Sequence, residues 1–405
     1  MDDILHRRAM LGAGASAGLI GLAGCATGQG PSGALWSNRS PAAVRQGRGP
    51  ERPRPRLAPL RASADRLFDL TVCIRPFRAA GPRLDTETIG DALIVHNYGH
   101  GGSGWSLSWG SGAIAVGKAM ANSPREVAVL GCGALGLTSA ILAQRSGAKV
   151  TIYARDLLPQ TRSARATGSW TPDSRIALKS AAGPGFGPLW EQMARTSWKT
   201  YRQYLGLPGT PVEFIDQYSI LKPPPPPPGS PPGHLDFMEL GERIADLTPG
   251  QERFPRGATP FGDVEVQRST TLMFNIADYG HTLMSDFFAA GGKFERREFH
   301  DPAELAALPQ KVVINCPGYA ARQLWRDASV TPVRGQIGWL IPQPEVRYGV
   351  TWGWVHMLSR RDGIVVQAYP GDVFGYGDDN ETVDRPESER TVAALAELYS
   401  NFMTA

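Results

Sequence analysis

The chain has 405 residues, a net charge of +4 and charged side chains at 20% of its positions. This length is enough for one large or two modest domains with a buried core. The cysteines Cys25, Cys73, Cys132 and Cys316 lie far apart and lack metal-ligand spacing, so neither a zinc site nor a disulfide lattice is expected.

Residues 1–25 have the features of a bacterial export signal. The pair Arg7-Arg8 is typical of a twin-arginine signal, and a glycine-rich apolar run follows it that is too short to predict a membrane span. The sequence Leu22-Ala23-Gly24-Cys25 resembles a lipobox, in which the cysteine is acylated. The alternative is a plain cleaved signal in which Cys25 has no role. We therefore expect a periplasmic protein, or one that faces the periplasm and touches the membrane only through a lipid anchor at Cys25.

Residues 26–66 are predicted to form a disordered tether. Arginine is concentrated between Arg39 and Arg66 among many prolines, which is the composition of a solvated segment. Aromatic residues do not interleave with this basic run, so nucleic acid is not an expected partner. Folded sequence is expected to begin near Leu67.

A stretch dense in glycine follows, with the sequence His96-Asn97-Tyr98-Gly99-His100-Gly101-Gly102-Ser103-Gly104. Successive backbone N–H groups can gather around a ring carbonyl only where no side chain intervenes. The glycines therefore predict a loop whose backbone other groups can approach closely. His96 and His100 are themselves expected to be loop histidines with structural hydrogen bonds.

The next segment has the pattern strand, glycine turn, helix, strand. Strands are predicted over 127–130 and 148–153 and a helix over 135–145, with Gly131-Cys132-Gly133-Ala134-Leu135-Gly136 at the turn. The three glycines allow a tight turn, close approach to a pyrophosphate, and close helix–strand packing. Asp156 stands where a ribose-binding acid is expected. The pattern predicts a dinucleotide-binding unit without choosing between flavin and nicotinamide.

The remaining predicted elements continue along the chain. Helical spacing is found over 189–204, 279–290 and 391–403, and strands are predicted over 311–316 and 364–367. The polyproline run 223–228 is predicted to be a loop inside a domain, since it cannot form a helix or a central strand.

The glycine turn and the His96–Gly104 stretch both resemble segments of the D-amino-acid oxidase family of flavoenzymes. In that family the glycine turn comes first and the histidine- and glycine-rich stretch comes last, whereas here the order is reversed. The resemblance implies a circularly permuted α/β fold, with a Rossmann-like FAD-binding domain and a substrate domain built on a large mixed β-sheet. Residues 67–118 would be equivalent to the family's C-terminal end, and residues 126–405 would hold both domains, intertwined.

The same resemblance assigns FAD as the cofactor. Tyr153–Pro159 resembles an Ala-Arg-Asp-Leu-Pro stretch of fungal members, followed by a serine- and threonine-rich turn. The residues that would contact FAD are Gly131, Gly133, Ala134, Leu135, Gly136, Arg155, Asp156, Arg162, Ser163, Thr167, Gly168, Ser169, Gly101, Gly102, Ser103, Gly104, Trp105 and Ser106.

Four residues are assigned to the substrate by resemblance. Arg75, in Ile74-Arg75-Pro76-Phe77-Arg78, falls on the arginine that binds the substrate carboxylate, and the carbonyl of Gly102 would hold the amine. His356 replaces a carboxylate-binding tyrosine, and an imidazole can also donate a hydrogen bond to a carboxylate, better when protonated. Trp352 stands where many members have a second, mobile tyrosine.

The sequence has one further match to the family and one further departure from it. Arg334-Gly335-Gln336 matches a family element, and Pro317 replaces a family threonine or serine before it.

The resemblance implies oxidation of a D-amino acid to the imino acid, and then to the 2-oxo acid and ammonia, with oxygen reduced to hydrogen peroxide. The alternatives are a flavin dehydrogenase for another amine or amino acid, and a flavin-binding lipoprotein without turnover. The substrate side chain, the electron acceptor, the oligomeric state and any covalent flavin bond stay open.

Overall fold

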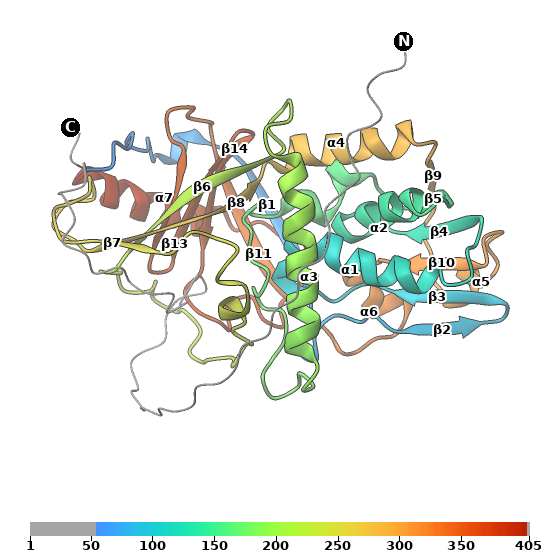
Figure 1. The fold of residues 1–405 in the computed structure, drawn as a ribbon. Coiled ribbons are helices and arrows are strands. Elements are labelled where there is room, and N and C mark those ends of the chain that lie inside the picture. Colours follow the sequence, from blue (N-terminus) through green and yellow to red (C-terminus); the bar gives the residue numbers. More distant parts are fainter. Residues whose placement is uncertain (1–53, 403–405) are drawn as a thin grey trace, which may run out of the picture. The chain divides into compact units, whose positions relative to one another are not determined.

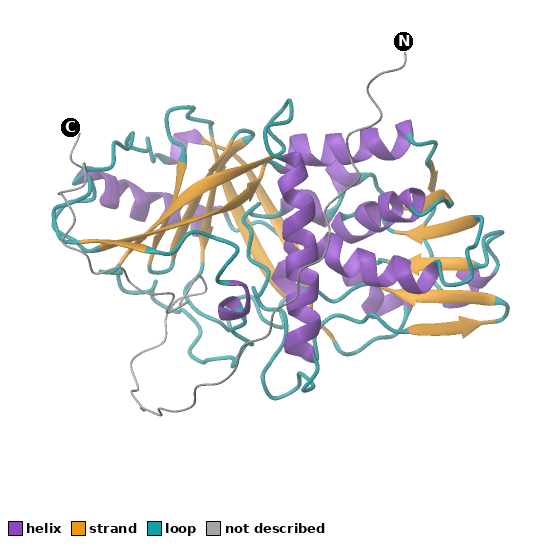
Figure 2. Ribbon diagram, in the orientation of Figure 1, coloured by secondary structure: helices purple, strands orange, loops and turns teal. Residues whose placement is uncertain are grey.

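The computed structural model describes residues 54–402, which form two β-sheets with helices packed against them (Figures 1 and 2). The expected export signal over residues 1–25, with Cys25, lies outside the described residues. Within the described part no helix is both long and apolar enough to cross a membrane.

The larger sheet has eight strands and is mixed, because β12 and β6 run parallel while the other neighbouring pairs are antiparallel. Helix α7 (Arg385–Ser400) packs on it through Val392 and Leu395. In the order in which they lie side by side, its strands are β1 (Leu67–Arg78), β11 (Val330–Leu340), β14 (Gly363–Ala368), β13 (Val355–Arg360), β12 (Tyr348–Trp352), β6 (Val212–Ile220), β8 (Val266–Phe274) and β7 (Glu252–Phe254).

The smaller sheet has six strands, and only the β2–β3 pair is antiparallel. Its order is β2 (Thr86–Ile89), β3 (Ala92–His96), β10 (Val312–Asn315), β4 (Glu126–Leu130), β5 (Lys149–Ala154) and β9 (Lys293–Arg296). In β4, Val127 and Val129 enter one apolar cluster while Ala128 and Leu130 enter another. A parallel strand buried on both faces is a continuous apolar run, which is the pattern that the sequence shows.

Helices α1 (Gly104–Ala119), α2 (Ala134–Arg145) and α4 (Ile276–Ala289) pack beside the smaller sheet, and α3 (Phe186–Tyr201) packs against α1 (Figure 1). The short helices are α5 (Pro302–Ala306) and α6 (Ala321–Leu324). The expected α/β architecture, with a Rossmann-like unit and a large mixed sheet, is confirmed.

Residues 67–119 are built into both sheets. Strand β1 pairs with β11 from Leu67 opposite Leu340 to Arg78 opposite Val330, and β3 lies between β2 and β10. Neither sheet could keep its observed edge without this segment.

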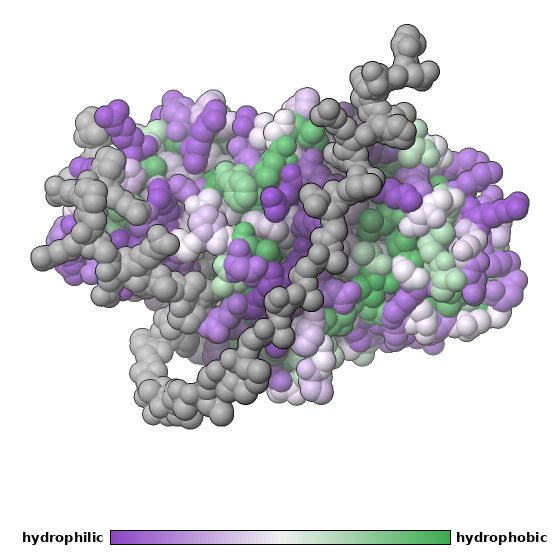
Figure 3. Space-filling model, in the orientation of Figure 1, coloured by the Kyte–Doolittle hydropathy of each residue, from purple (hydrophilic) through white to green (hydrophobic). Residues whose placement is uncertain are grey.

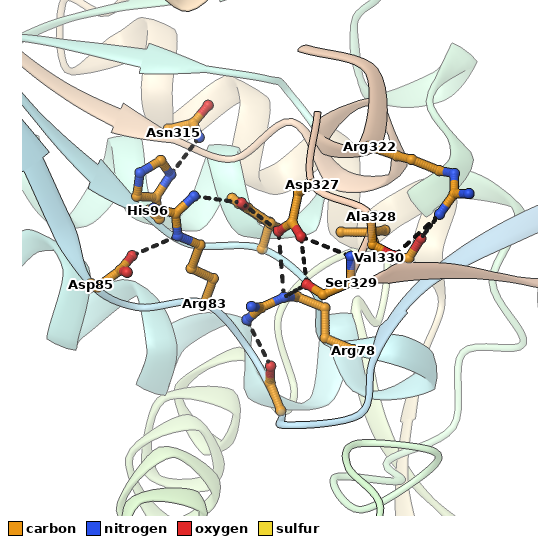
Figure 4. A network of polar contacts seen from close by, with 12 residues as sticks. Arg78, Arg83, Asp85, His96, Asn315, Arg322, Asp327, Ala328, Ser329 and Val330 are labelled. Atoms are coloured by element: carbon orange, nitrogen blue, oxygen red, sulfur yellow. Dashed lines mark hydrogen bonds and ion pairs between the residues drawn. The ribbon is translucent and has the colours of Figure 1, made fainter. Parts of the chain in front are cut away.

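A polar network joins the ends of these strands to the loop before β11 (Figure 4). The guanidinium of Arg78 donates to Ser329 Oγ at 2.9 Å, and the Tyr98 hydroxyl donates to Asp327 Oδ2 at 2.9 Å. His96 Nδ1 lies 2.8 Å from the side-chain nitrogen of Asn315 at the end of β10. His96 also lies 2.8 Å from a carboxylate oxygen of Glu87, so it has the structural hydrogen bonds that were expected, although it is the last residue of β3 and does not lie in a loop.

The prediction of a disordered tether over residues 26–66 is wrong at the C-terminal end of that range. Residues 57–66 pack against the larger sheet, where the Leu60 side chain is 4% exposed and the Tyr348 hydroxyl donates to the carbonyl of Ala58 at 2.6 Å. Gln343 also hydrogen-bonds this stretch, through the Pro59 carbonyl and the Arg61 N–H. Proline and arginine gave the stretch a disordered composition, but its few apolar side chains find a partner in the sheet.

Helix α7 begins earlier than the helix predicted over 391–403. The carboxylate of Asp384 accepts the Glu387 N–H at 3.0 Å and Pro386 occupies the first turn, so a polar capped turn precedes the apolar face. The other predicted helices and strands agree with the structure apart from shifts at their ends.

The surface drawn in Figure 3 is mostly polar with smaller apolar areas between the polar side chains. Large exposed apolar side chains, among them Phe68, Phe214 and Phe288, belong to β1, β6 and α4. These side chains therefore belong to separate elements of the described chain.

Candidate active site

A cavity of about 520 Å³ is lined by residues from both sheets. Its wall brings together parts of the chain that are far apart in sequence. From the first part of the chain it includes residues 73–76 of β1, residues 100–102 and 104–106, and residues 130–135. From the later part it includes residues 154–156, several residues between 160 and 175, and residues 297–299, 316–320, 334–336, 356, 367–369 and 374. The carboxyl ends of β4, β5 and β10 meet here, which is where open α/β sheets bind their ligands.

The glycine turn after β4 forms one end of the wall. Gly131 has φ +94°, and a side chain on it would collide with the carbonyl oxygen of Cys316. A side chain on Gly133 would lie 2.7 Å from Ser163 Oγ, which accepts the N–H of Ala134 at 3.0 Å. The N-terminus of α2 therefore faces the cavity, and its positive dipole end suits a phosphate group.

Basic and acidic residues follow at the end of β5. Arg155 Nε lies 2.8 Å from an oxygen of Asp156, and both residues line the cavity with Arg162 and Ser163. Thr167, Gly168 and Ser169 continue the same wall.

Two residues that the resemblance assigns to FAD lie behind the wall. The Gly136 backbone packs against the carbonyl of Gly131, which is the close helix–strand contact expected of the third glycine. The Ser103 hydroxyl lies within hydrogen-bond distance of the carbonyls of Thr171 and Ser174, at 3.1 and 3.0 Å. Both residues shape the cavity without lining it.

The glycine-rich loop is pressed against the segment that ends at Arg175. Gly101 has φ +54°, and a side chain there would collide with the carbonyl oxygen of Arg175. The N–H of Gly102 donates to the Ser174 carbonyl at 3.1 Å, and a side chain on Gly102 would lie 2.7 Å from Ser174 Oγ. The glycines are thus required by the neighbouring backbone as well as by any ligand.

His100 differs from the expected loop histidine. It is 1% exposed, lines the cavity, and has no hydrogen-bond partner for either ring nitrogen among the described residues. Burial lowers the pKa of His100 to about 3.

Arg75 projects from β1 into the cavity wall. Its guanidinium packs so closely over Gly335 that a side chain on Gly335 would collide with it. Arg75 Nη1 donates to the carbonyl of Arg334 at 3.4 Å. Arg75 forms no ion pair with any carboxylate of the described residues.

The neighbouring Arg334 and Gln336 have a structural role. Arg334 is buried, donates to the carbonyls of Asn380 and Thr382, and lies 3.5 Å from a carboxylate oxygen of Glu387. The side-chain amide of Gln336 donates to the carbonyl of Asp384 and accepts from its N–H, just before α7 begins. The Arg-Gly-Gln element therefore fixes the segment before α7, and its glycine admits Arg75.

His356 lies in the wall on β13, opposite Gln367 of β14. Its Nδ1 lies 3.2 Å from the Thr351 hydroxyl, and burial lowers the pKa of His356 to about 4. The imidazole is therefore neutral near pH 7, and the expected help of a protonated ring in carboxylate binding does not apply at that pH.

Trp352 does not line the cavity, which corrects its predicted place in the site. Its indole N–H donates to the carbonyl of Lys222 at 2.7 Å, and that of Trp354 donates to Pro225 at 2.9 Å. The two indoles hold the polyproline run 223–228, which is a loop as predicted. A proline-rich segment exposes its carbonyls, so it offers acceptors to tryptophan.

Arg175 and Tyr369 are wall residues that the sequence analysis missed. Arg175 has φ +48°, is 4% exposed, and donates to the carbonyls of Asp372 and Phe374 at 3.2 and 3.1 Å. Its guanidinium carbon lies 4.5 Å from the centre of the Tyr369 ring. Burial, together with the nearby charge of Arg75, lowers the pKa of Arg175 to about 10. No local pattern marks a buried arginine, so only the fold could reveal this pair.

The two buried histidines predict how stability changes with pH. Between pH 6.5 and about 4 the unfolded chain binds protons at His100 and His356 that the folded chain does not bind. The free energy of unfolding should therefore fall as the pH is lowered from 7 to 5, by about 1.4 kcal/mol per pH unit for each histidine below pH 6.5. Denaturant titrations at fixed FAD concentration measure this slope.

His100→Gln should reduce the slope, whereas the matched change at exposed His281 should leave it unaltered. A slope identical in wild type and His100→Gln would contradict the burial of a neutral His100.

The residues present fit a flavin dinucleotide. The glycine turn leaves backbone space, the α2 N-terminus faces the cavity, and an acid stands at the end of β5.

The structure is similar in fold to the iminodiacetate oxidase of Chelativorans sp. BNC1, with a TM-score of 0.46 and 15% identity over 68% of this chain and 79% of that chain.

Sequence relatives include two proteins named D-amino-acid oxidase. The one from Rubrobacter xylanophilus is 30% identical over 214 residues, which is 52% of this chain and 57% of that protein. The one from Streptomyces coelicolor is 30% identical over 213 residues, 52% of this chain and 58% of that protein. The chain thus spans less than two thirds of the length of these relatives.

A family model described as FAD dependent oxidoreductase (DAO) matches residues 126–404, which is more than half of the chain. The match includes the glycine turn and most of the strands around the cavity. The chain therefore belongs to this family of FAD-dependent oxidoreductases, and FAD is its cofactor.

Proposed function

We propose that this protein oxidises a D-amino acid to the imino acid, which water then converts to the 2-oxo acid and ammonia. The chemistry that FAD supplies when bound is acceptance of a hydride from the α-carbon, with oxygen reduced to hydrogen peroxide on reoxidation. The observation that carries the proposal is the half-buried Arg75, which lies in the cavity wall without an ion-pair partner among the described carboxylates. A planar guanidinium in that position suits a substrate carboxylate.

The other wall residues have positioning roles. The Gly102 carbonyl accepts from the substrate amine, while its N–H is engaged by Ser174 and so holds the peptide in place. His356, neutral at pH 7, contributes a single neutral hydrogen bond in place of the family tyrosine. Catalysis then depends on orientation beside the cofactor and needs no dedicated acid or base.

The first test is the visible spectrum of the purified holoprotein before and after anaerobic addition of D- and L-amino acids. Bleaching by D isomers alone, with peroxide formed when air is admitted, is the expected result. Bleaching without peroxide would favour a flavin dehydrogenase, and a flavin that no amine reduces would favour a binding protein without turnover.

Arg75→Gln should lower kcat/KM by about 100-fold because it removes a charge-assisted bidentate pair. Its FAD content should equal that of wild type, and unchanged kinetics would contradict the role of Arg75.

We further propose that the chain is circularly permuted, with residues 67–118 equivalent to the end of the family's usual order. Two observations support this. The family model begins at residue 126, after this segment, and the short 3-10 helix Ala64–Arg66 contacts α7 near the end of the chain. Because this 3-10 helix contacts α7, we expect that a short connection can join the two ends of the described part of the chain.

A reordered chain tests this proposal. Residues 126–402 followed by a short linker and residues 54–119 should fold, bind FAD and unfold at a similar denaturant concentration. A control opened inside β11, at Gly335, should not fold, since it interrupts the pairing with β1. Loss of FAD binding in the reordered chain would contradict the proposed equivalence.

We also propose export to the periplasmic side with acylation at Cys25, on the basis of Arg7-Arg8 and Leu22–Cys25. Fractionation of a bacterium that expresses the full chain should find the protein with the membrane, and Cys25→Ser should move it to the soluble periplasm. Replacement of Arg7 and Arg8 by lysine should retain it in the cytoplasm. A wild-type protein found in the cytoplasm would contradict the proposal.

A further inference from the structure

Arg75 and Arg175 differ from the other arginines that line the cavity. The others lie within ion-pair distance of described carboxylates: Arg155 with Asp156, Arg162 and Arg165 with Glu381, Arg297 with Glu304, and Arg334 with Glu387. Within the described part of the chain, Arg75 and Arg175 form no such pair. The carboxylate of Asp372 contributes a favourable charge to Arg175 from beyond ion-pair distance, and it lies within hydrogen-bond distance of His234 Nδ1.

The guanidinium of Arg175 is held in place from several sides. Two backbone carbonyls accept from its Nη2, and the Tyr369 ring lies against it. Its Nε is buried and has no hydrogen-bond partner among residues 54–402. The carbonyl of Arg175 lies so close to Gly101 that a side chain on Gly101 would collide with it, and the N–H of Gly102 donates to the neighbouring Ser174 carbonyl.

Two like charges in one partly buried cavity repel one another. Each guanidinium is most stable with a carboxylate, and a ligand with a single carboxylate leaves the other arginine uncompensated. A ligand with two carboxylates satisfies both, and each guanidinium offers a planar fork of N–H donors to its carboxylate.

We propose that Arg175 determines substrate specificity by binding a second carboxylate, so that the preferred substrate is an amino acid with an acidic side chain. This inference rests on the proposed function, in which Arg75 binds the α-carboxylate. The carbonyls of Asp372 and Phe374 accept from the guanidinium of Arg175, and Tyr369 covers its face.

The wild-type protein provides the first test. The kcat/KM for D-aspartate or D-glutamate should exceed that for D-asparagine or D-glutamine, which have nearly the same shape, by about 10- to 100-fold. A higher value for the amides would overturn the inference while leaving the proposed D-amino-acid oxidation intact.

Binding of non-reacting acids gives a second readout that does not require turnover. Succinate and butyrate have equal chain lengths but two and one carboxylates, and their dissociation constants follow from the flavin spectrum or from the thermal midpoint. Succinate should bind at least tenfold more tightly. Equal binding would overturn the inference even if no amino acid reduces the flavin, a result that would separately contradict the proposed function.

Variants then assign the preference to Arg175. Arg175→Met should remove the preference for succinate and for the acidic substrate, because it should lower kcat/KM for the acid much more than kcat/KM for the amide. Arg175→Lys should restore part of it, because it keeps the charge without the planar fork. The matched control is Arg253→Met, at an arginine paired with Glu265 outside the cavity wall, and it should keep the full preference.

Two results would overturn the assignment. One is an Arg175→Met protein that keeps the preference, and the other is one that loses FAD, which would show that Arg175 holds the cofactor. If this variant does not fold, the succinate and butyrate constants of wild type and Arg175→Lys decide the matter.

Discussion

The antiparallel pairing of β1 with β11 is the constraint on which the cavity depends. It runs the length of β1, places Cys73 opposite Gly335, and holds Arg75 over that glycine. Backbone hydrogen bonds along a long strand pair position a side chain more rigidly than a loop could. The same segment then continues into β3 and the glycine-rich loop, so one stretch of chain delivers both the arginine and the loop to the cavity. The polar network around Asp327 secures the ends of these strands (Figure 4).

Steric crowding determines several glycines more strongly than conformational freedom does. Gly101 and Gly102 allow the backbone of Ser174 and Arg175 to approach, and Gly335 allows the guanidinium of Arg75 to lie flat. A Cβ at any of these positions would push apart two walls of the cavity. The glycine-rich loop therefore also sets the shape of the site, since this loop and the segment after β5 are fitted to each other.

Charge in the cavity is arranged unevenly. The arginines near the glycine turn and at the start of α7 are paired with carboxylates, so their charges are largely compensated within the protein. Arg75 and Arg175 are compensated mainly by backbone carbonyls and an aromatic ring. Buried His100 and His356 stay neutral near pH 7 and add no charge of their own. Among the arginines that line the cavity, Arg75 and Arg175 are therefore the two without an ion pair to a described carboxylate.

The sequence by itself determined the dinucleotide-binding unit, because a buried parallel strand, a glycine turn and a following helix are local patterns with a physical cause. It also placed most of the wall residues, since the glycine-rich motifs are specific. The sequence did not reveal that the indole of Trp352 hydrogen-bonds the carbonyl of Lys222, outside the cavity wall. It also did not reveal that residues 57–66 pack against the larger sheet. That Arg75 and Arg175 line the same cavity was likewise decided only by the tertiary structure. These contacts join residues far apart in sequence, and burial and charge compensation arise only when such segments meet.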